Sequence, residues 1–364
     1  MTNRIVVANL LHRRMRTALA VSAIAVEVAM ILLMLGLADG LVGESTRKQR
    51  GIGADVVIFD PTSSGGFSAG TASLPESLVA EIEKMPGVEM AMGRTFSMQR
   101  QLQTVTGVDL EQFTRMSGGL EFLQGGPFQG PYDAIVDEVF ARQEKLSAGD
   151  TVQFFNRDFR VAGITHSGKL SRIFVPLTTM QEVMGWQGKL SQVYVKLDDP
   201  SQATAFVQQL KQMLPKHPIY TMEESISLFT AQTRGRADDF IGVIVGIAMV
   251  VGFIVVLMSM YTAVLDRTRD IGILKALGAR PGYIVDIFLR ETFVLTCAGV
   301  VLGIGLAFLA QSWLVDRFPL VAVVIEQRHI IWAIVVSIVG SLLGSLYPSW
   351  KAARQDAIDA LAYE

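Results

Sequence analysis

Four long apolar stretches constrain this chain more than any other feature of its sequence. They cover residues 17–41, 239–262, 291–314 and 330–350, and each approaches or exceeds the roughly 20 residues that a helix needs to cross the hydrocarbon core of a bilayer. The second contains FIGVIVGIAMVVGFIVVLMSMY, which has no charged side chain. The sequence therefore predicts a multi-pass α-helical membrane protein with four transmembrane helices.

Composition agrees with this fold class and excludes several functions. Half of the residues are hydrophobic (50%) and only 18% are charged, whereas a typical soluble protein has about 25% charged residues. The formal net charge of −2 gives no basic field for nucleic acid, so we expect no nucleic-acid partner. A single cysteine, Cys297, excludes an internal disulfide. The four histidines do not stand at the spacing typical of metal ligands, so no metal site is expected.

The first apolar stretch could be a cleaved signal peptide, because basic residues precede it. The apolar run is too long for the hydrophobic region of such a peptide, however, and no small-x-small cleavage site follows it. We therefore expect it to be retained as a membrane helix.

The distribution of lysine and arginine predicts how the chain is oriented. The N-terminal segment 1–16 contains four of these residues and the loop 263–290 contains five, whereas the loop 315–329 contains two. Because short cytoplasmic loops are enriched in positive charge, both termini, including the tail 351–364, and the loop 263–290 are expected in the cytoplasm. The segment 42–238 would then form a large domain outside the cytoplasm, in the periplasm or its equivalent.

The segment 42–238 has the polar composition and length of a folded domain. Helical patterns at 137–146 and 201–214 and alternating strands around Asn156-Arg157-Asp158 predict a large α+β domain with a β-hairpin. Strand and helix signals at both ends surround a β-rich middle, which predicts two lobes, one inserted into the other.

The segment Gly163-Ile-Thr-His-Ser-Gly168-Lys169 matches the first part of the phosphate-binding loop pattern, G-x-x-x-x-G-K. Leu170 stands where such a loop has the Ser or Thr that binds Mg²⁺, and the segment follows a hairpin strand on the periplasmic side. We therefore expect no nucleotide site and no ATPase activity in this chain.

Small residues recur at helical spacing in three of the four apolar stretches. A Gly-x-x-x-Gly pattern lets helix backbones approach closely, either within one chain or between two chains, and the sequence does not distinguish these cases. One ionisable residue, Glu27, lies within the first stretch and is expected to face protein or water, in either a functional or a structural role. The predicted packing glycines are Gly242, Gly246, Gly299, Gly303, Gly340 and Gly344.

The cytoplasmic loop contains a short amphipathic helix pattern. Ile271, Leu274 and Leu277 recur at helical spacing, and Gly278 precedes Pro281-Gly282, which predicts the end of a helix. Such a helix could rest on lipid or dock in a groove of a partner protein.

Several motifs resemble those of FtsX-like permeases, the membrane subunits of MacB-type ABC systems. The run RTRDIGILKALGAR is similar to the family pattern E-R-x-x-E-I-G-I-L-[KR]-A-[IL]-G-A. The N-terminal NLLHRRMRT, the segment GIGADVVIFDP and the ending YPSWKAARQDAIDALAYE resemble further family segments, so the likeness covers nearly the whole chain. Thr268-Arg269 and Ala357 depart from the family pattern, which affects the expected details of the contacts with the ATPase.

The resemblance implies a non-catalytic membrane subunit that works as a dimer, either with a second copy of itself or with a homologous permease. Its other partners would be a cytoplasmic ABC ATPase that binds ATP and Mg²⁺, membrane lipid and, in some relatives, a periplasmic adaptor protein. The resemblance implies mechanotransmission: ATP-driven closure of the ATPase would move the cytoplasmic ends of the helices, and the outer domain would shift in response. The residues expected to couple to the ATPase are Arg267, Asp270, Ile271, Leu274, Lys275, Leu277, Gly278 and Ala279.

Two other functions remain open at this stage. The chain could be a transmembrane signalling subunit that controls a periplasmic hydrolase, as FtsX proteins of cell division do. It could also be a membrane-bound enzyme, although no nucleophile with a base, metal site or carboxylate pair stands at recognisable spacing. No catalytic residue and no cofactor in this chain are therefore predicted, and the substrate is left open as a hydrophobic or amphipathic molecule for export or extraction.

Overall fold

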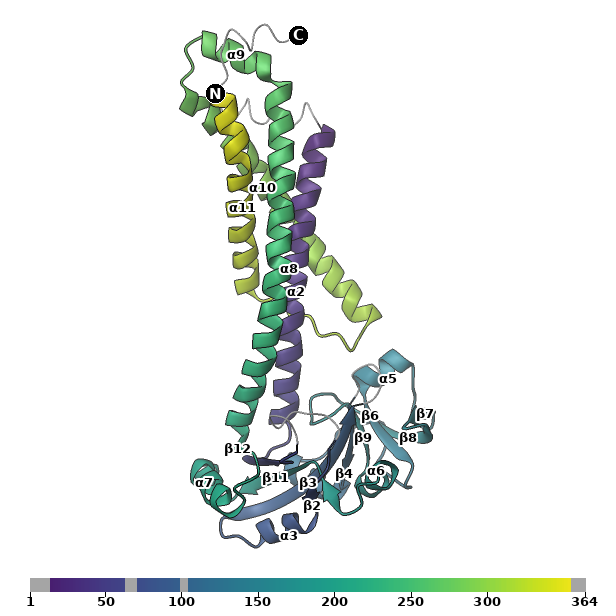
Figure 1. Ribbon diagram of the computed structural model, residues 1–364. Helices are drawn as coiled ribbons and strands as arrows, with labels where there is room; N and C mark the ends of the chain where they lie inside the picture. The colour runs from purple at the N-terminus through teal and green to yellow at the C-terminus, as the bar shows by residue number, and fades with distance from the viewer. Residues whose placement is uncertain (1–13, 63–70, 99–103, 355–364) are drawn as a thin grey trace. The chain divides into compact units, whose positions relative to one another are not determined.

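The computed structural model describes residues 14–62, 71–98 and 104–354 (Figure 1). The chain divides into two compact units. The helical unit contains the described residues up to Gly40, Arg236–Arg317 and those from Val323 onward, and the large unit contains Leu41–Gly235 and Phe318–Ala322. Each unit is described by itself below.

Four helices in the described residues are long and apolar enough to cross a membrane. They are α2 (Arg14–Arg50), α8 (Met222–Asp266), α10 (Pro281–Arg317) and α11 (Gln327–Arg354). A short helix, α9 (Thr268–Ala276), connects α8 to α10. The predicted class, a multi-pass helical membrane protein with four spanning helices and a large α+β domain between the first two, is confirmed.

The helices extend beyond the apolar stretches from which they were predicted. Polar residues continue each helix beyond its apolar stretch. Hydropathy indicates which residues lipid can cover, but it does not indicate where the hydrogen-bonded helical backbone ends. Helix α11 likewise runs through Pro348 to Arg354, although a proline inside a helix removes one backbone hydrogen bond.

Two of the three glycine pairs pack inside the helical unit. A Cβ atom on Gly299 would lie 2.6 Å from the Ile24 side chain, and one on Gly303 would lie 2.7 Å from the Ala25 carbonyl oxygen, so α10 and α2 are in backbone contact. In α11, a Cβ on Gly344 would lie 2.8 Å from the Phe253 carbonyl oxygen of α8, and one on Gly340 would make only ordinary contact, 3.7 Å from Met249. The close approaches therefore require glycine at positions 299, 303 and 344.

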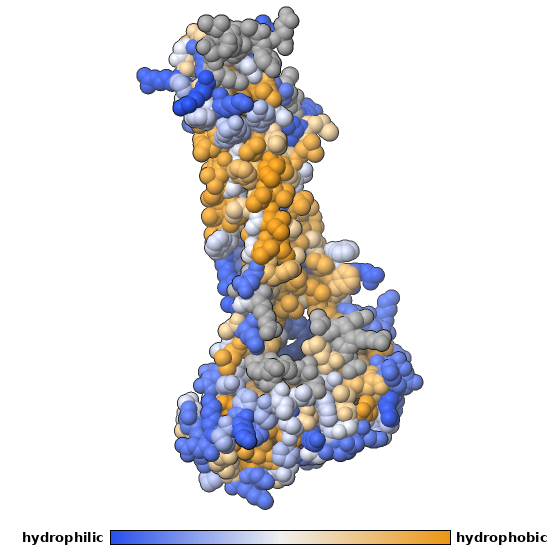
Figure 2. Space-filling model, viewed as in Figure 1, coloured by the Kyte–Doolittle hydropathy of each residue, from blue (hydrophilic) through white to orange (hydrophobic). Residues whose placement is uncertain are grey.

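The third pair, Gly242 and Gly246, is different. Both residues are exposed, and a Cβ on either would meet no atom within 4 Å. Figure 2 shows apolar side chains covering much of the visible face of the helical unit, as expected for a surface in contact with lipid.

The large unit is built on a ten-stranded mixed sheet in the order β12-β1-β11-β3-β4-β9-β6-β8-β5, with β7 paired to β8. A separate two-stranded sheet joins β2 (Leu74–Pro75) to β10 (Lys189–Leu190). The strands of the main sheet are β1 (Val56–Phe59), β3 (Val88–Met98), β4 (Thr104–Val108), β5 (Phe122–Gly125), β6 (Asp133–Asp137), β7 (Thr151–Phe154), β8 (Arg157–Thr165), β9 (Ile173–Pro176), β11 (Gln192–Leu197) and β12 (Ile219–Thr221).

Helices on the sheet enclose separate apolar clusters. At the β1-β11-β3 end, α3 (Ser77–Glu83) and α7 (Ala203–Met213) cover one face of the sheet, with Ile82 and Phe206 buried in the first cluster. The strand residues that point to the opposite face, among them Met92 and Tyr194, form a second cluster with Phe113 of α4 (Leu110–Ser117). At the β9-β6-β8 end, α5 (Glu138–Glu144) and α6 (Leu177–Met184) cover a third cluster. The middle of the segment, from β4 to β9, thus forms one end of the sheet, and the two flanking parts form the other.

The β7–β8 hairpin turns one residue earlier than the sequence indicated. Phe155 and Asn156 are the two turn residues, both with positive φ (53° and 58°), and Arg157 already pairs with Phe154 in the ladder. Asparagine tolerates this left-handed conformation, which explains why a tight turn forms here.

Candidate coupling site at the end of the helical unit

Helix α9 ends in a glycine turn that fixes its length. Gly278 has φ +92°, its N–H donates to the Lys275 carbonyl at 2.9 Å, and the Ala279 N–H donates to the Leu274 carbonyl at 3.0 Å. This pair of hydrogen bonds around a left-handed glycine is the Schellman arrangement, which satisfies the last carbonyls of a helix. Gly278 therefore terminates α9 as its place in the sequence indicates.

The apolar residues of α9 point in different directions. Ile271 is buried in the apolar core of the helical unit, Leu274 is half-buried, and Leu277 is 81% exposed. Six residues rotate a helix by about one and two-thirds turns, so Ile271 and Leu277 do not share a face. Exposed Ile273 joins Leu277 on the outward surface instead.

The polar residues of the segment surround this outward surface. Arg269 and Asp270 in the first turn and Arg280 after the last are exposed, while Lys275 and Ala279 are half-buried. The surface formed by Ile273 and Leu277 is thus apolar at its centre and charged at its edge, which is the usual composition of a small protein-binding surface.

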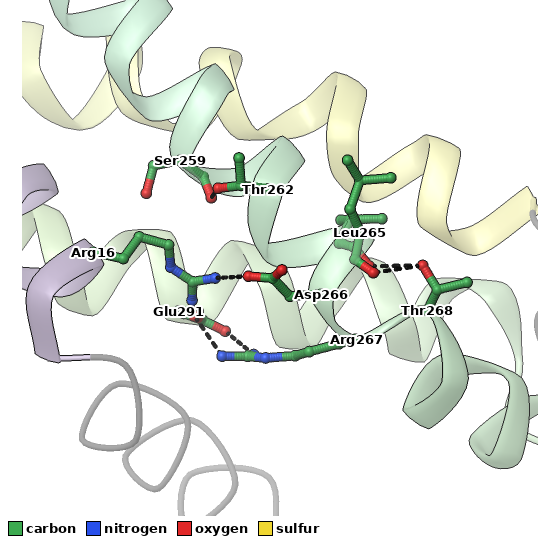
Figure 3. A network of polar contacts seen from close by, with 9 residues as sticks. Arg16, Ser259, Thr262, Leu265, Asp266, Arg267, Thr268 and Glu291 are labelled. Carbon is green, nitrogen blue, oxygen red and sulfur yellow. Dashed lines mark hydrogen bonds and ion pairs between the residues drawn. The ribbon is translucent and has the colours of Figure 1, made fainter. Parts of the chain in front are cut away.

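A buried ion-pair network holds the start of α9 (Figure 3). Arg267 Nη1 lies 2.8 Å from Glu291 Oε2, and Arg16 Nη2 lies 3.2 Å from Glu291 Oε1. Arg16 also pairs with Asp266 at 3.7 Å, between Nη1 and Oδ2. Glu291 is fully buried, so one carboxylate from α10 binds both the first turn of α2 and the residue that precedes α9.

This geometry directs Arg267 into the helical unit, although the sequence placed it among the residues that contact a partner. Arg16 and Glu291 were not selected from the sequence, even though a lone carboxylate at the edge of an apolar stretch is a signal for a paired group. Thr268 contributes to the same junction, because its Oγ1 donates to the Val264 and Leu265 carbonyls at the end of α8.

A second polar junction lies within the large unit, which includes the last residues of α2. Arg172 Nη2 lies 2.5 Å from Glu44 Oε1 of α2 and 3.4 Å from the Leu320 carbonyl oxygen in the α10–α11 connection. Glu44 also pairs with Lys48 at 2.6 Å. Arg172 therefore joins, within the large unit, two segments that lead directly into membrane helices.

The loop that mimics a phosphate-binding loop belongs to this junction. Leu170 N–H donates to the Lys48 carbonyl at 2.9 Å, and a Cβ on Gly51 would lie 2.5 Å from the Gly168 carbonyl oxygen. Lys169 Nζ donates to the Ser117 carbonyl at 2.8 Å and to that of Gly119. The lysine thus caps the end of α4, and the loop packs against the end of α2.

Glu27 is buried within the helical unit and lies against α8. It is 9% exposed, and its carboxylate occupies the space in which Gly252 would carry a side chain. The residue therefore faces protein, as expected for an ionisable group in an apolar stretch.

Three side chains with metal-ligand chemistry meet where α2 and α11 adjoin in the helical unit. The ligand atoms of Asp39, Glu326 and His329 lie within 4.8 Å of one another. The Glu326 N–H donates to His329 Nδ1 at 3.2 Å, which leaves Nε2 to donate to Asp39 Oδ2 at 3.0 Å, and Arg328 pairs with both carboxylates. These contacts form a hydrogen-bonded link between the two helices. The guanidinium of Arg328 supplies the positive charge that a metal ion would otherwise bring to the two carboxylates.

Four apolar helices, a short helix held at the end of the helical unit and a large α/β domain define an integral membrane subunit with an extramembrane domain. The family model of the MacB-like periplasmic core domain matches residues 17–213. The family model of the FtsX-like permease C-terminal region matches residues 242–357. The chain therefore belongs to the MacB-like and FtsX-like permease family of ABC transport systems, and the resemblance drawn from its motifs is confirmed.

Curated relatives of this family cover nearly all of the chain. The macrolide export ATP-binding/permease protein MacB of Vibrio parahaemolyticus is 25% identical over 96% of this chain, which spans 58% of that protein's length. An uncharacterized ABC transporter permease of Bacillus subtilis, YknZ, is 24% identical and is matched over 98% of its length and 99% of this chain. Among solved structures, the periplasmic region of MacB from Actinobacillus actinomycetemcomitans aligns with 50% of this chain and 94% of its own, with 20% identity and a TM-score of 0.38.

Proposed function

We propose that this chain is the membrane subunit of an ABC transporter in the bacterial inner membrane, coupled to an ATPase on a separate chain. The ATPase would bind ATP and Mg²⁺, and this chain would hold neither. The observation that carries the proposal is the outward apolar surface of α9, formed by Ile273 and Leu277, on a helix whose start is fixed by the buried Glu291 pairs.

A docking helix transmits force only when it cannot move independently of the membrane helices. Arg267 is held by a fully buried carboxylate, and Ile271 fills the apolar core next to it. Removing one member of a buried ion pair costs about 3–5 kcal/mol, so the junction resists separation. Movement of a docked ATPase would therefore move α2 and α10 together with α9.

Helix α2 then provides a continuous connection to the large unit. It is 37 residues long, which corresponds to roughly 55 Å at 1.5 Å per residue. Arg16 lies at its start, in the ion-pair network, and Glu44 lies near its end, paired with Arg172. This arrangement supports mechanotransmission, in which a shift at the α9 junction displaces the large unit.

Two buried hydroxyls of α10 are satisfied within their own helix and are therefore not available to a hydrophilic substrate. The buried hydroxyls of Thr292 and Thr296 donate to the Phe288 and Thr292 carbonyls of their own helix, at 3.0 and 2.9 Å. We infer that the large unit handles the substrate, and that this substrate is a hydrophobic or amphipathic molecule that is exported or extracted from the membrane.

A second copy of the chain is proposed to pack against α8. Gly242 and Gly246 are exposed, and Val243 and Ile247 beside them are about three-fifths exposed (62% and 59%). Because small residues at this spacing favour close helix contacts, the open face fits a partner helix better than the glycine pairs that are already packed. The positive charge of the loop between α8 and α10 supports a cytoplasmic location for α9 and for both termini.

Affinity purification of the tagged full chain from its native membrane in mild detergent, with mass spectrometry of bound proteins, tests the proposal. We expect an ABC ATPase in about equal amount, lost in Leu277→Glu and retained in Met213→Glu. Met213 is the matched control because it is 60% exposed at the end of α7 in the large unit. Recovery of no ATPase by a folded, dimeric wild-type chain contradicts the proposal.

A further inference from the structure

Arg94 occupies an unusual position in the large unit. It lies on β3, opposite Gln192 on β11 and opposite Val108 on β4, so it is in the interior of the ten-stranded sheet. Side chains alternate along a strand, which places Arg94 on the same face as Met92, Phe96 and Met98.

The guanidinium is held by neutral groups. Its Nε donates to Gln192 Oε1 at 2.7 Å, and its Nη2 donates to the same oxygen. The Tyr194 hydroxyl also donates to this oxygen, at 2.8 Å. The guanidinium carbon lies 4.9 Å from the centre of the Phe96 ring and 5.2 Å from that of Tyr194.

The positive charge of Arg94 has no counter-ion within the described part of the chain. Its hydrogen bonds there go to an amide oxygen, and no carboxylate there pairs with it. Burial lowers the pKa of the guanidinium, as expected for a charge removed from water without an opposite charge beside it. A carboxylate at position 192 would supply that charge, but the residue there is an amide.

The third nitrogen of the group is available to a ligand. Arg94 is half-buried, and its Nη1 makes no hydrogen bond with the described residues and is not fully enclosed by them. Arginine binds carboxylates and phosphates through such free N–H groups.

Two neighbours extend the polar and apolar character of this face. Thr106 lies directly opposite Phe96 on β4, is fully buried, and its Oγ1 has no hydrogen-bond partner. Met98, two residues beyond Phe96 on the same face, is 47% exposed. A cation without a counter-ion among the described residues and a hydroxyl without a hydrogen-bond partner thus lie on the same face as an exposed apolar side chain.

We propose that Arg94 binds the anionic head group of an amphipathic ligand, with Phe96 and Met98 contacting its apolar chain. The head group is a carboxylate or a phosphate, since a guanidinium recognises both. The proposal deepens the proposed function by naming the chemical class of the substrate, and it rests on that function only for calling the ligand a substrate.

Gln192→Glu tests the proposal because it supplies the missing counter-ion without changing the volume of the side chain. The probe is 11-(dansylamino)undecanoate, titrated by fluorescence against the full chain in dodecyl maltoside, with its methyl ester as the uncharged probe. We expect wild type to bind the carboxylate at least tenfold more tightly than the ester. Gln192→Glu should abolish this preference while the unfolding temperature stays equal or rises. Gln153→Glu, on the exposed strand β7, is the control for the added charge and should leave binding unchanged.

Substitutions at Met98 give a second test that does not disturb the core. Met98→Asp should weaken binding of the carboxylate probe about fivefold or more, and Met98→Lys should not weaken it. Competition by dodecyl phosphate, compared with undecanoate, distinguishes the two head groups. Equal binding of both probes to wild type, or unchanged binding in a folded Gln192→Glu variant, overturns the proposal. Neither result depends on an ATPase, so a failure here is distinct from a failure of the proposed function.

Discussion

The carboxylate of Glu291 lies 2.8 Å from Arg267 Nη1 and is fully shielded from solvent. The same carboxylate binds Arg16 at 3.2 Å, so two arginines from different segments share a single buried anion. Glu291→Gln keeps the volume but removes the buried carboxylate that Arg267 and Arg16 share, which should cost about 3–5 kcal/mol of stability. Thermal unfolding and limited proteolysis of the full chain in detergent, with cleavage sites mapped around α9, measure the effect.

Asp286→Asn is the matched control for this substitution. Asp286 Oδ2 pairs with Arg290 Nε at 2.8 Å on the same helix, but both side chains are about half exposed (44% and 51%). Because exposed ion pairs contribute about 0–1 kcal/mol, its loss should be small. Equal effects of the two substitutions would show that the Glu291 pairs do not hold α9.

Gly252 should not tolerate a methyl group, because the carboxylate of Glu27 fills that space. Gly252→Ala is expected to destabilise the chain by about 1–3 kcal/mol through overpacking. Gly305→Ala, at an exposed position of α10 with no atom within 4 Å of its Cβ position, should not. Thermal unfolding of the two variants distinguishes these outcomes. Removal of the carboxylate in Glu27→Ala should make the chain tolerant of Gly252→Ala. If the destabilising effects of Glu27→Ala and Gly252→Ala simply add, the contact between Glu27 and Gly252 is contradicted.

The pair formed by Arg172 and Glu44 should be energetically coupled. A double-mutant cycle with Arg172→Gln and Glu44→Gln is expected to give a coupling energy of about 1–3 kcal/mol, the upper part of the range for groups in one polar network. The exposed pair of Lys196 and Glu89, at 2.9 Å, provides the comparison and should give less than about 1 kcal/mol. Chemical unfolding of the full chain measures both cycles, and a coupling near zero for Arg172 and Glu44 argues against this junction.

Asp137 should make the large unit less stable as pH rises. Burial raises the pKa of its carboxyl above the usual 3.8, although the Phe140 N–H and the charges of Arg172 and Lys48 act in the opposite direction. A raised pKa means that the folded state binds the proton more tightly than the unfolded state, so stability falls as pH rises through the raised pKa. Asp137→Asn cannot ionise, and its unfolding temperature relative to wild type should be higher at about pH 8 than at about pH 4.5. A difference between Asp137→Asn and wild type that does not change with pH contradicts the assignment.

Local sequence was sufficient for the features that depend on near neighbours. Apolar runs predicted the four membrane helices, and Gly278 before Pro281 predicted the end of α9, since hydropathy and backbone conformation are properties of short segments. Phe206 and Leu210 are buried on α7 at the spacing that indicated an amphipathic helix.

Features that depend on distant pairs could not be predicted in this way. Arg267 was expected on a docking surface, but its direction is set by Glu291, which lies 24 residues away. Gln192 and Arg94 are 98 residues apart, and only the β3–β11 register brings them together. Composition gives the charge of such residues but not the neighbour that each one meets.

Site-directed crosslinking at Leu277 is the most direct test that α9 docks on an ATPase. Cys297 is the single cysteine of the chain, so Cys297→Ser with Leu277→Cys gives one reactive thiol for a benzophenone maleimide. Irradiation of the native membrane should give an adduct that contains this chain and an ABC ATPase, identified by mass spectrometry, and Met213→Cys in the same background should give none. An absence of ATPase adducts at Leu277, or equal adducts at both positions, would contradict the coupling role of α9.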